Sequence, residues 1–235
     1  MTEYTVGLNS THNQEPVQTF HVGARLLGTI ATAMHVDINI NELDYWSAIV
    51  AAARAYDDLV DRPGSTTSSR DALELFSGGT VPGLDDTIVD NLHTVMTTQH
   101  SARYHVAQKA FMTLSDFAEE RRSAKSVSSL LDINIAEANG FADMLCVDET
   151  GPRASQRVRL NKWIKHFSRA GYIFDTATDL KKDADNGLIA IAPTRFNQMR
   201  ILSHALPDTV EGIRYTPAAL VRPLYRIIAD NMRTG

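Results

Sequence analysis

Two groups of aspartates in the chain have spacings that would stack carboxylates on helices. In the first group, Asp57 and Asp61 are four residues apart, so they lie one turn above each other on a helix, whereas Asp58 points about 100° away. Like charges at this spacing repel, and the dipole of a helix C-terminus disfavours anions further. A bound divalent cation would offset both costs.

The second group extends the same pattern over two turns. Asp175, Asp179 and Asp183 stand at positions i, i+4 and i+8, which forms a ridge of about 12 Å on one helix face. The other side of this helix carries apolar or small residues: Ile173, Ala177 and Leu180. The segment is therefore an acidic ridge on a helix that is otherwise suited to burial.

Carboxylates in this arrangement indicate magnesium and phosphate chemistry. Mg²⁺ prefers oxygen ligands and is usually held by a few carboxylates plus substrate phosphates. Two facing ridges would suit a diphosphate clamped through two or three Mg²⁺ ions, which neutralise charge on the leaving group. The sequence has no GxSxG, Walker, HExxH or GxGxxG motif. We therefore predict the following catalytic metal ligands: Asp57, Asp61, Asp175, Asp179 and Asp183.

The alternative interpretation is that both groups are ordinary solvated helix ends. Either group alone is weak evidence for a metal site. Their combination is stronger, because each stands late on a long helix and the 118 residues between Asp57 and Asp175 (175 − 57) leave room for a helical hairpin.

The elements that must position these residues are helical. Phe20, Ala24, Leu27 and Ala31 recur at helical spacing from Val17 onward. Further helices are predicted at 42–60, with Asn41 and Asp44 as its capping pair, and at 70–76, 85–97, 102–122, 127–146 and 155–183. Pro63-Gly64 and Asn186-Gly187 are predicted to end the helices that precede them. The short segment Leu188–Ile191 and Pro193 follow, and a helical tail is predicted from Pro217.

This pattern predicts an all-α, single-domain helical bundle of about seven to nine helices. Residues 1–15 are predicted to be a polar tail and residues 16–235 the domain.

Composition excludes several classes. The 235 residues are 43% hydrophobic and 22% charged, which is typical of globular chains and not of disorder. The net charge of −5 argues against nucleic-acid binding. Apolar runs are too short to span a membrane, and the N-terminus does not resemble a secretory signal, so we expect a cytoplasmic protein. The single cysteine, Cys146, excludes an intramolecular disulfide and a cysteine-based zinc site.

The aspartate segments resemble those of the class I isoprenoid synthase superfamily, above all its squalene/phytoene synthase branch. Residues 54–64, Arg-Ala-Tyr-Asp-Asp-Leu-Val-Asp-Arg-Pro-Gly, are similar to the first aspartate motif, which has an arginine three residues upstream. Residues 175–187, running into Pro193, are similar to the second motif, although the family usually has Asn where Asp175 stands. Residues 136–141 loosely resemble the helix break of small residues before that motif.

The resemblance, over roughly residues 45–195, implies an all-α fold with a central apolar cavity, a Mg²⁺ cluster and an allylic prenyl diphosphate substrate. Expected diphosphate-binding residues are Arg54, Lys182, and the pair Arg214-Tyr215, which resembles the Arg-Tyr pair of terpene cyclases. Arg121-Arg122 could add a phosphate contact or be a plain charged helix end. Aromatic walls for a carbocation are expected from Phe141, Trp163, Phe167 and Phe174. A homodimer is expected only by analogy of fold.

Departures from the family bear on the reaction. Residues 20–28 stand in place of the usual N-terminal Ser-x-Ser-Phe region, and residues 187–190 lack the usual Arg and Tyr. Those elements help hold a second prenyl diphosphate, so we predict a terpene synthase that uses one. The alternatives are head-to-head condensation of the squalene/phytoene type, prenyl transfer, a helical diphosphohydrolase, and a non-catalytic partner subunit of a prenyl synthase.

Overall fold

A computed structural model describes residues 16–62, 65–98 and 103–223, with side chains from residue 24 onward. The described residues form helices joined by turns and loops, without a β-strand, which confirms the all-α prediction. The predicted polar tail at 1–15 and the Pro63-Gly64 turn lie outside the described residues.

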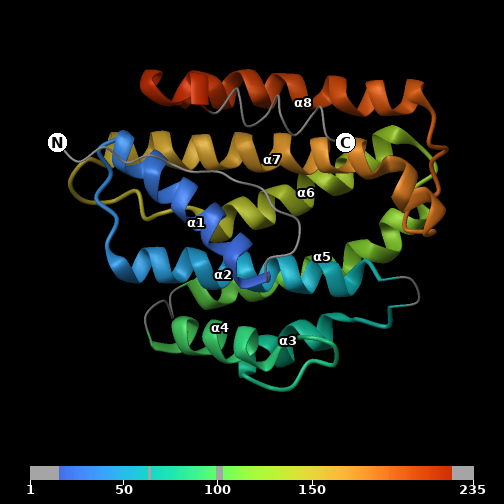
Figure 1. Cartoon of the computed structure of the whole chain (residues 1–235), viewed down its shortest axis with the longest axis horizontal. Helices are drawn as coiled ribbons and strands as arrows, with labels where there is room; N and C mark the ends of the chain where they lie inside the picture. The colour runs from blue at the N-terminus through green and yellow to red at the C-terminus, as the bar shows by residue number, and fades with distance from the viewer. Residues whose placement is uncertain (1–15, 63–64, 99–102, 224–235) are drawn as a thin grey trace.

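Figure 1 shows how the labelled helices of the described residues are arranged. Their bounds are α1 Pro16–Ala33, α2 Ile40–Val60, α3 Ser69–Ser77, α4 Asp86–Thr98, α5 Tyr104–Ser123, α6 Val127–Leu145, α7 Ala154–Asp185 and α8 Arg195–Tyr215. The long helix α7 packs against α6 on one side and against the antiparallel α8 on the other. Helix α2 packs against α1, α4 and α5, while α3 and α4 lie on the side of the molecule away from α8.

Helix α2 begins two residues earlier than the sequence predicted. Asn39 is the N-cap, and its side-chain oxygen accepts a hydrogen bond from the Glu42 backbone N–H at 2.9 Å. The predicted cap at Asn41 is therefore wrong, because Asn41 is already inside the first turn. The predicted end is correct: the helix stops at Val60, and Asp61 is its C-cap.

Helix α7 ends at the turn that the sequence predicted. Gly187 has a φ of +72°, a left-handed conformation that favours glycine. The Leu188 N–H donates to the Asp183 carbonyl at 2.9 Å and the Gly187 N–H to the Ala184 carbonyl at 3.1 Å, which is a Schellman motif. The motif places Asp183 in the last turn of the helix.

Helix α8 was not predicted. Pro207 stands in its middle, and a proline there removes one backbone hydrogen bond and normally argues against a helix. The helix nevertheless forms, because Thr194 caps its start and Ile201, Ala205 and Gly212 are buried. The helical tail expected from Pro217 is present over residues 218–223, and the remainder lies outside the described residues.

The core consists of two clusters of buried side chains. The larger joins α1 to α5 with the end of α6 and the first half of α7. The smaller lies where the start of α6, the second half of α7 and the start of α8 meet, and it buries the predicted apolar side of the second acidic segment: Ile173, Ala177 and Leu180. That burial turns the aspartates of α7 away from the smaller cluster.

No helix in the described part of the chain is long and apolar enough to cross a membrane.

Candidate functional site

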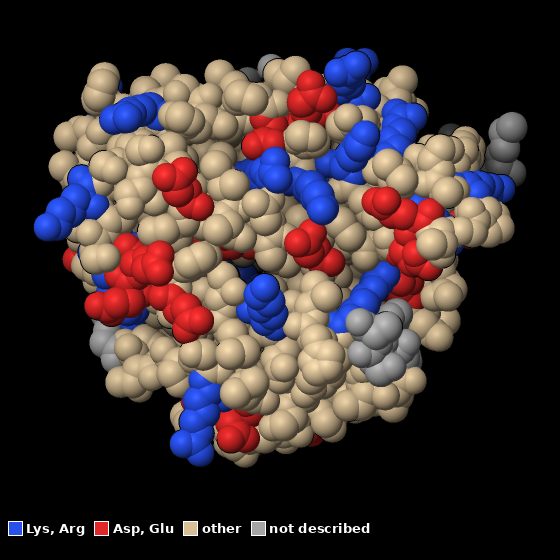
Figure 2. Space-filling model, turned by 180° about the vertical axis from the view of Figure 1, so that it is seen from behind, with Lys and Arg blue, Asp and Glu red and all other residues tan. Residues whose placement is uncertain are grey.

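The C-terminal ends of α2 and α7 point to the same side of the molecule, and their aspartates act on one another electrostatically. The charge of Asp61 raises the pKa of both Asp175 and Asp183, on the other helix. Asp179 is half-buried between its two neighbours on the α7 ridge. Acidic side chains also gather at this end in Figure 2, on the left of the face seen from behind. The two helix ends therefore lie within electrostatic range of each other, and we call the five predicted aspartates on them the acidic site.

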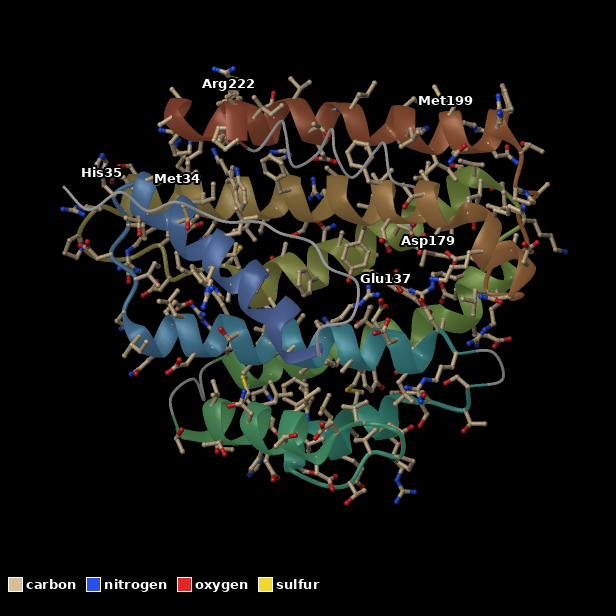
Figure 3. All side chains as sticks on the ribbon, viewed as in Figure 1. Met34, His35, Glu137, Asp179, Met199 and Arg222 are labelled. Atoms are coloured by element: carbon tan, nitrogen blue, oxygen red, sulfur yellow. The ribbon has the colours of Figure 1, made fainter. Side chains whose placement is uncertain are left out.

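A buried ion pair from α5 and α6 lies beside the acidic site. The Arg121 guanidinium donates to Asp61 at 2.9 Å and also to Glu137, whose side chain is only 1% exposed. In the view of Figure 3, Glu137 and Asp179 are both seen between the ribbons of α7 and α2. Arg121 thus connects the first aspartate segment to Glu137, a carboxylate that solvent does not reach.

Four carboxyl groups in this region have raised pKa values. Burial and the neighbouring charge of Asp61 raise the pKa of Asp57 to about 7, although Arg121 opposes the shift. Burial and the charge of Asp179 raise the pKa of Asp183 to about 6, and the same causes raise the pKa of Asp175. Burial raises the pKa of Glu137 to about 6, against the effect of Arg121. The site carries more negative charge than its own cations offset.

Arg122, in the last turn of α5, contacts the end of α2. It donates to the Val60 carbonyl at 3.3 Å, next to the Asp61 contact of Arg121. Both arginines of α5 therefore fix the last turn of α2, where unpaired carbonyls favour a cation. Both arginines stand in the last turn of α5, the charged helix end that the sequence indicated, but the sequence alone could not place that end against α2.

The predicted phosphate contacts on α2 and α7 lie at the rim of the acidic site. Arg54 is 57% exposed and pairs with Asp58 at 3.1 Å, and its charge partly opposes the rise in the pKa of Asp57 and Asp175 that burial causes. Lys182 is 69% exposed and pairs with Asp179 at 3.3 Å. Both side chains are accessible to an anion that binds at the aspartates.

Arg214 and Tyr215 lie elsewhere. Because α8 runs antiparallel to α7, its C-terminus lies beside the first half of α7, where the Tyr215 ring stacks on His166 at 5.8 Å between centroids. His166 precedes Asp175 by nine residues, about 14 Å along the helix. Arg214 is exposed and pairs with Glu211 at 3.6 Å. The structure does not bring this pair to the acidic site.

An apolar pocket of about 260 Å³ lies between α1, α6 and α7. Three of the four predicted cavity aromatics line it, namely Phe141, Trp163 and Phe167. The Trp163 and Phe167 rings are 4.5 Å apart between centroids. Phe174 does not line this pocket: it stands seven residues after Phe167, about two turns further along α7, where it packs against the smaller core cluster.

Tyr172 connects the pocket with the acidic site. Its ring lines the pocket, 6.2 Å from the Phe141 ring between centroids. Burial and the charges of Asp57 and Glu137 raise the pKa of its hydroxyl, so that hydroxyl remains a neutral hydrogen-bond donor. The apolar pocket and the acidic site are therefore neighbouring parts of one region.

The donor set fits magnesium by type. All five predicted ligands are carboxylates, and hard cations prefer oxygen. In the described residues no three histidine, cysteine or acidic side chains are already gathered around one ion position. Asp61 and Asp179 instead take their contacts from Arg121 and Lys182. A cation would relieve the repulsion that raises the pKa of Asp57 and Asp183.

Two residues of this region, Glu137 and Tyr172, escaped sequence reasoning as parts of the site, and Arg121 was considered only as a possible phosphate contact. Glu137 belongs to the segment that resembled a helix break, yet α6 continues through Gly140. The sequence did contain one signal for Glu137: it is a carboxylate between two alanines in a predicted helix, a pattern that suggests a buried charge. Its partner Arg121 could be identified only from the packing of α5 on α6.

Comparisons with known proteins found no match to a family model, a curated protein or a solved structure.

Proposed function

We propose that the chain is a Mg²⁺-dependent class I terpene synthase that ionises an allylic prenyl diphosphate and then cyclises or quenches the carbocation. The observation that carries this proposal is that Tyr172 lines the apolar pocket and also interacts electrostatically with carboxylates of the acidic region. The acidic region is rich in carboxylates and suits a metal-bound diphosphate, and the pocket is apolar with aromatic walls. A prenyl diphosphate has the same two parts.

In this proposal the acidic ligands Asp57, Asp61, Asp175, Asp179 and Asp183 hold two or three Mg²⁺ ions. When bound, the ions supply Lewis-acid neutralisation of the diphosphate as it leaves. Arg54 and Lys182 at the rim contact the phosphate oxygens by charge. Asp61 and Asp179 must then exchange their present contacts with Arg121 and Lys182 for the ions and the substrate.

The pocket would receive the hydrocarbon chain. Phe141, Trp163 and Phe167 would present ring faces to the chain, which attract a cation by about 0.5–2 kcal/mol. Tyr172 can donate a hydrogen bond at the boundary between the chain and the diphosphate. Proton loss or capture of water ends the reaction.

The pocket volume favours one prenyl chain. At about 260 Å³ it is smaller than the roughly 300 Å³ at which small-molecule sites begin. Head-to-head condensation requires room for two chains, so the geometry favours cyclisation over the squalene/phytoene type of reaction. Prenyl transfer to a small acceptor stays an alternative, and analysis of the product distinguishes it from cyclisation.

The test is release of diphosphate from geranyl, farnesyl and geranylgeranyl diphosphates with and without Mg²⁺, followed by mass spectrometry of a hexane extract. We expect release only with Mg²⁺, and a cyclic hydrocarbon or alcohol with the carbon number of its substrate. A product of doubled carbon number would replace the proposal with head-to-head condensation. Intact substrates in all cases would refute an enzymatic role.

The matched variants are Asp183→Asn and Asp185→Asn, which change the same side chain on the same helix. Asp183 belongs to the ridge, whereas Asp185 is exposed at the helix end. We expect the first to reduce the turnover number by at least about 100-fold, the usual effect of losing one electrostatic contact to the leaving group, and the second to retain activity. Equal losses in both variants would argue against a ridge that binds metal.

A second candidate function is a non-catalytic subunit that binds a prenyl synthase or its substrate. The observation in its favour is that Asp61 and Asp179 already have cationic partners within the chain. Calorimetry with a non-hydrolysable thio-analogue of farnesyl diphosphate distinguishes the two. Mg²⁺-dependent binding without turnover supports the second candidate, and turnover excludes it.

A further inference from the structure

The outer face of α8 is an apolar stripe exposed to solvent. Phe196, Met199, Leu206 and Val210 are 76%, 64%, 58% and 61% exposed, and they are four of the seven large hydrophobic side chains found exposed in the described residues. On a helix these positions fall within a sector of about 80°. Such a contiguous patch usually marks a binding surface. We call it the α8 stripe.

The α8 stripe contributes nothing to the packing of the helix in this fold. Helix α8 binds α7 through Ile201, Ala205 and Gly212, which lie on the opposite side. Figure 3 shows Met199 on the outer side of α8, away from α7. The apolar side chains of the α8 stripe therefore remain largely exposed in the monomer.

Basic side chains border the α8 stripe. Arg195, Arg200 and Arg214 are exposed on this helix. Arg222, from the turn of helix that follows, lies on the same outer side as Met199 in Figure 3. Glu211 is the acidic residue of this border, and it is already paired with Arg214. Four arginines therefore gather here on a chain whose net charge is −5.

We propose that the α8 stripe docks on an anionic lipid surface. A helix with an apolar face bordered by arginines lies in the plane of a membrane interface, with its apolar side chains below the headgroups and its cations among the phosphates. Helix α8 is 21 residues long, so it presents about 30 Å parallel to such a surface. The contact is peripheral, and it is independent of the function proposed for the acidic site.

A second copy of the chain fits the α8 stripe less well. The spacing of 196, 199, 206 and 210 is compatible with helix pairing, and Ser203 fills the remaining position of that pattern. A two-fold contact, however, sets a patch against itself. The arginine borders of two copies would then face each other, whereas lipid phosphates neutralise them.

The test is flotation of the full chain with vesicles of pure phosphatidylcholine and with vesicles that also contain phosphatidylglycerol. We expect binding to the anionic vesicles, weakened by high salt, and little binding to the neutral ones. The variant F196S/M199S should lose roughly tenfold or more in vesicle affinity. Val106→Ser is the matched control, because Val106 is 45% exposed on α5, away from the α8 stripe. It should bind like the parent chain.

Size-exclusion chromatography with light scattering completes the test, and circular dichroism verifies that F196S/M199S is folded. Failure of the parent chain to bind anionic vesicles would overturn the proposal. Equal binding by F196S/M199S and the parent would also overturn it. A dimer of the parent that F196S/M199S abolishes, without vesicle binding, would identify the α8 stripe as a contact between copies instead.

Discussion

At the residue scale, the acidic site is a concentration of negative charge that the fold tolerates at a cost. Asp57 is half-buried, faces Asp61, and shares Arg121 with it and with Glu137. Such groups reduce stability when they ionise, and proteins keep them mostly where binding or catalysis needs them. Two predictions concern how removing the charge of individual residues in this region changes the stability of the fold.

The first concerns the pH dependence of stability in metal-free buffer. The folded-state pKa of Asp57 is raised to about 7 from the model-peptide value of 3.8, so the folded state binds the proton more tightly than the unfolded state. Its contribution to stability is therefore complete below about pH 4 and is lost as the pH rises through about 7. Asp57→Asn should raise the free energy of unfolding at pH 8 by roughly 1–2 kcal/mol, allowing for partial solvation of the carboxylate.

Urea denaturation with EDTA at pH 4 and pH 8 measures this effect. The gain should be confined to pH 8, and Mg²⁺ should reduce it by stabilising the parent chain only. Asp58→Asn is the neighbouring control, since Asp58 is exposed and pairs only with Arg54 at the surface. A gain of the same size at both pH values would show that the charge of Asp57 is not its cause.

The second prediction concerns the buried pair. Arg121→Met leaves Glu137 buried beside Asp61 without its cation, which should lower the free energy of unfolding by about 3–5 kcal/mol. Adding Glu137→Gln should restore at least 1 kcal/mol, because the uncompensated charge disappears. A double-mutant cycle by urea denaturation measures the coupling. If the two losses simply add, Arg121 and Glu137 do not stabilise each other.

At the element scale, the close approach of α8 to α7 shapes one wall of the pocket. Gly212 of α8 lies against Phe167 of α7, and a Cβ at position 212 would be 2.7 Å from the Phe167 ring. Phe167 also packs on Trp163 and lines the pocket. The absence of a side chain at position 212 thus sets the position of an aromatic wall residue that stands eight residues before Asp175 on the same helix.

Substituting alanine for two helical glycines distinguishes the effect of packing on stability from the effect of helix propensity. Gly212→Ala should lower the free energy of unfolding by about 1–3 kcal/mol, because Phe167 must shift. Gly171→Ala places the same methyl group on α7 where no atom lies within 4 Å, in the open pocket. It should raise stability by about 0.5–1 kcal/mol. Thermal denaturation of both variants tests this contrast, and equal signs would contradict it.

At the scale of the whole molecule, α6 connects the two core clusters and also joins α2. The Tyr45 hydroxyl donates to the Met144 carbonyl at 2.7 Å, and the Trp46 ring N–H donates to the Leu145 carbonyl at 3.0 Å. Cys146 follows at the end of α6, packed against the larger cluster. Access to this thiol therefore reports on opening of the α2–α6 contact.

Burial raises the pKa of the Cys146 thiol to about 11, although Lys165 acts in the opposite direction. At pH 8 the folded chain then holds little of the reactive thiolate, and we expect alkylation by iodoacetamide to be at least about tenfold slower than in urea. Trp46→Phe, which removes one of the two hydrogen bonds, should accelerate the reaction of the folded chain. Rates that are equal in the folded and unfolded chains would show that the thiol is open.

The sequence by itself determined the helical class, most helix bounds and the two aspartate ridges. Those features depend on local spacing: Asp175, Asp179 and Asp183 share a face wherever that segment is helical, and Gly187 ends the helix by its own backbone freedom. Three of the four aromatic wall residues were also predicted from the sequence, because they stand on the helices that carry or precede the second ridge.

Only the tertiary structure decided which groups meet across helices. Arg121 and Glu137 pair because α5 packs on α6, and Arg214 lies far from the acidic site because α8 runs antiparallel to α7. Helix α8 itself forms despite Pro207, since burial against α7 outweighs one lost hydrogen bond. Local patterns encode neither the packing partner nor the direction of a helix, because both depend on contacts between residues distant in the chain.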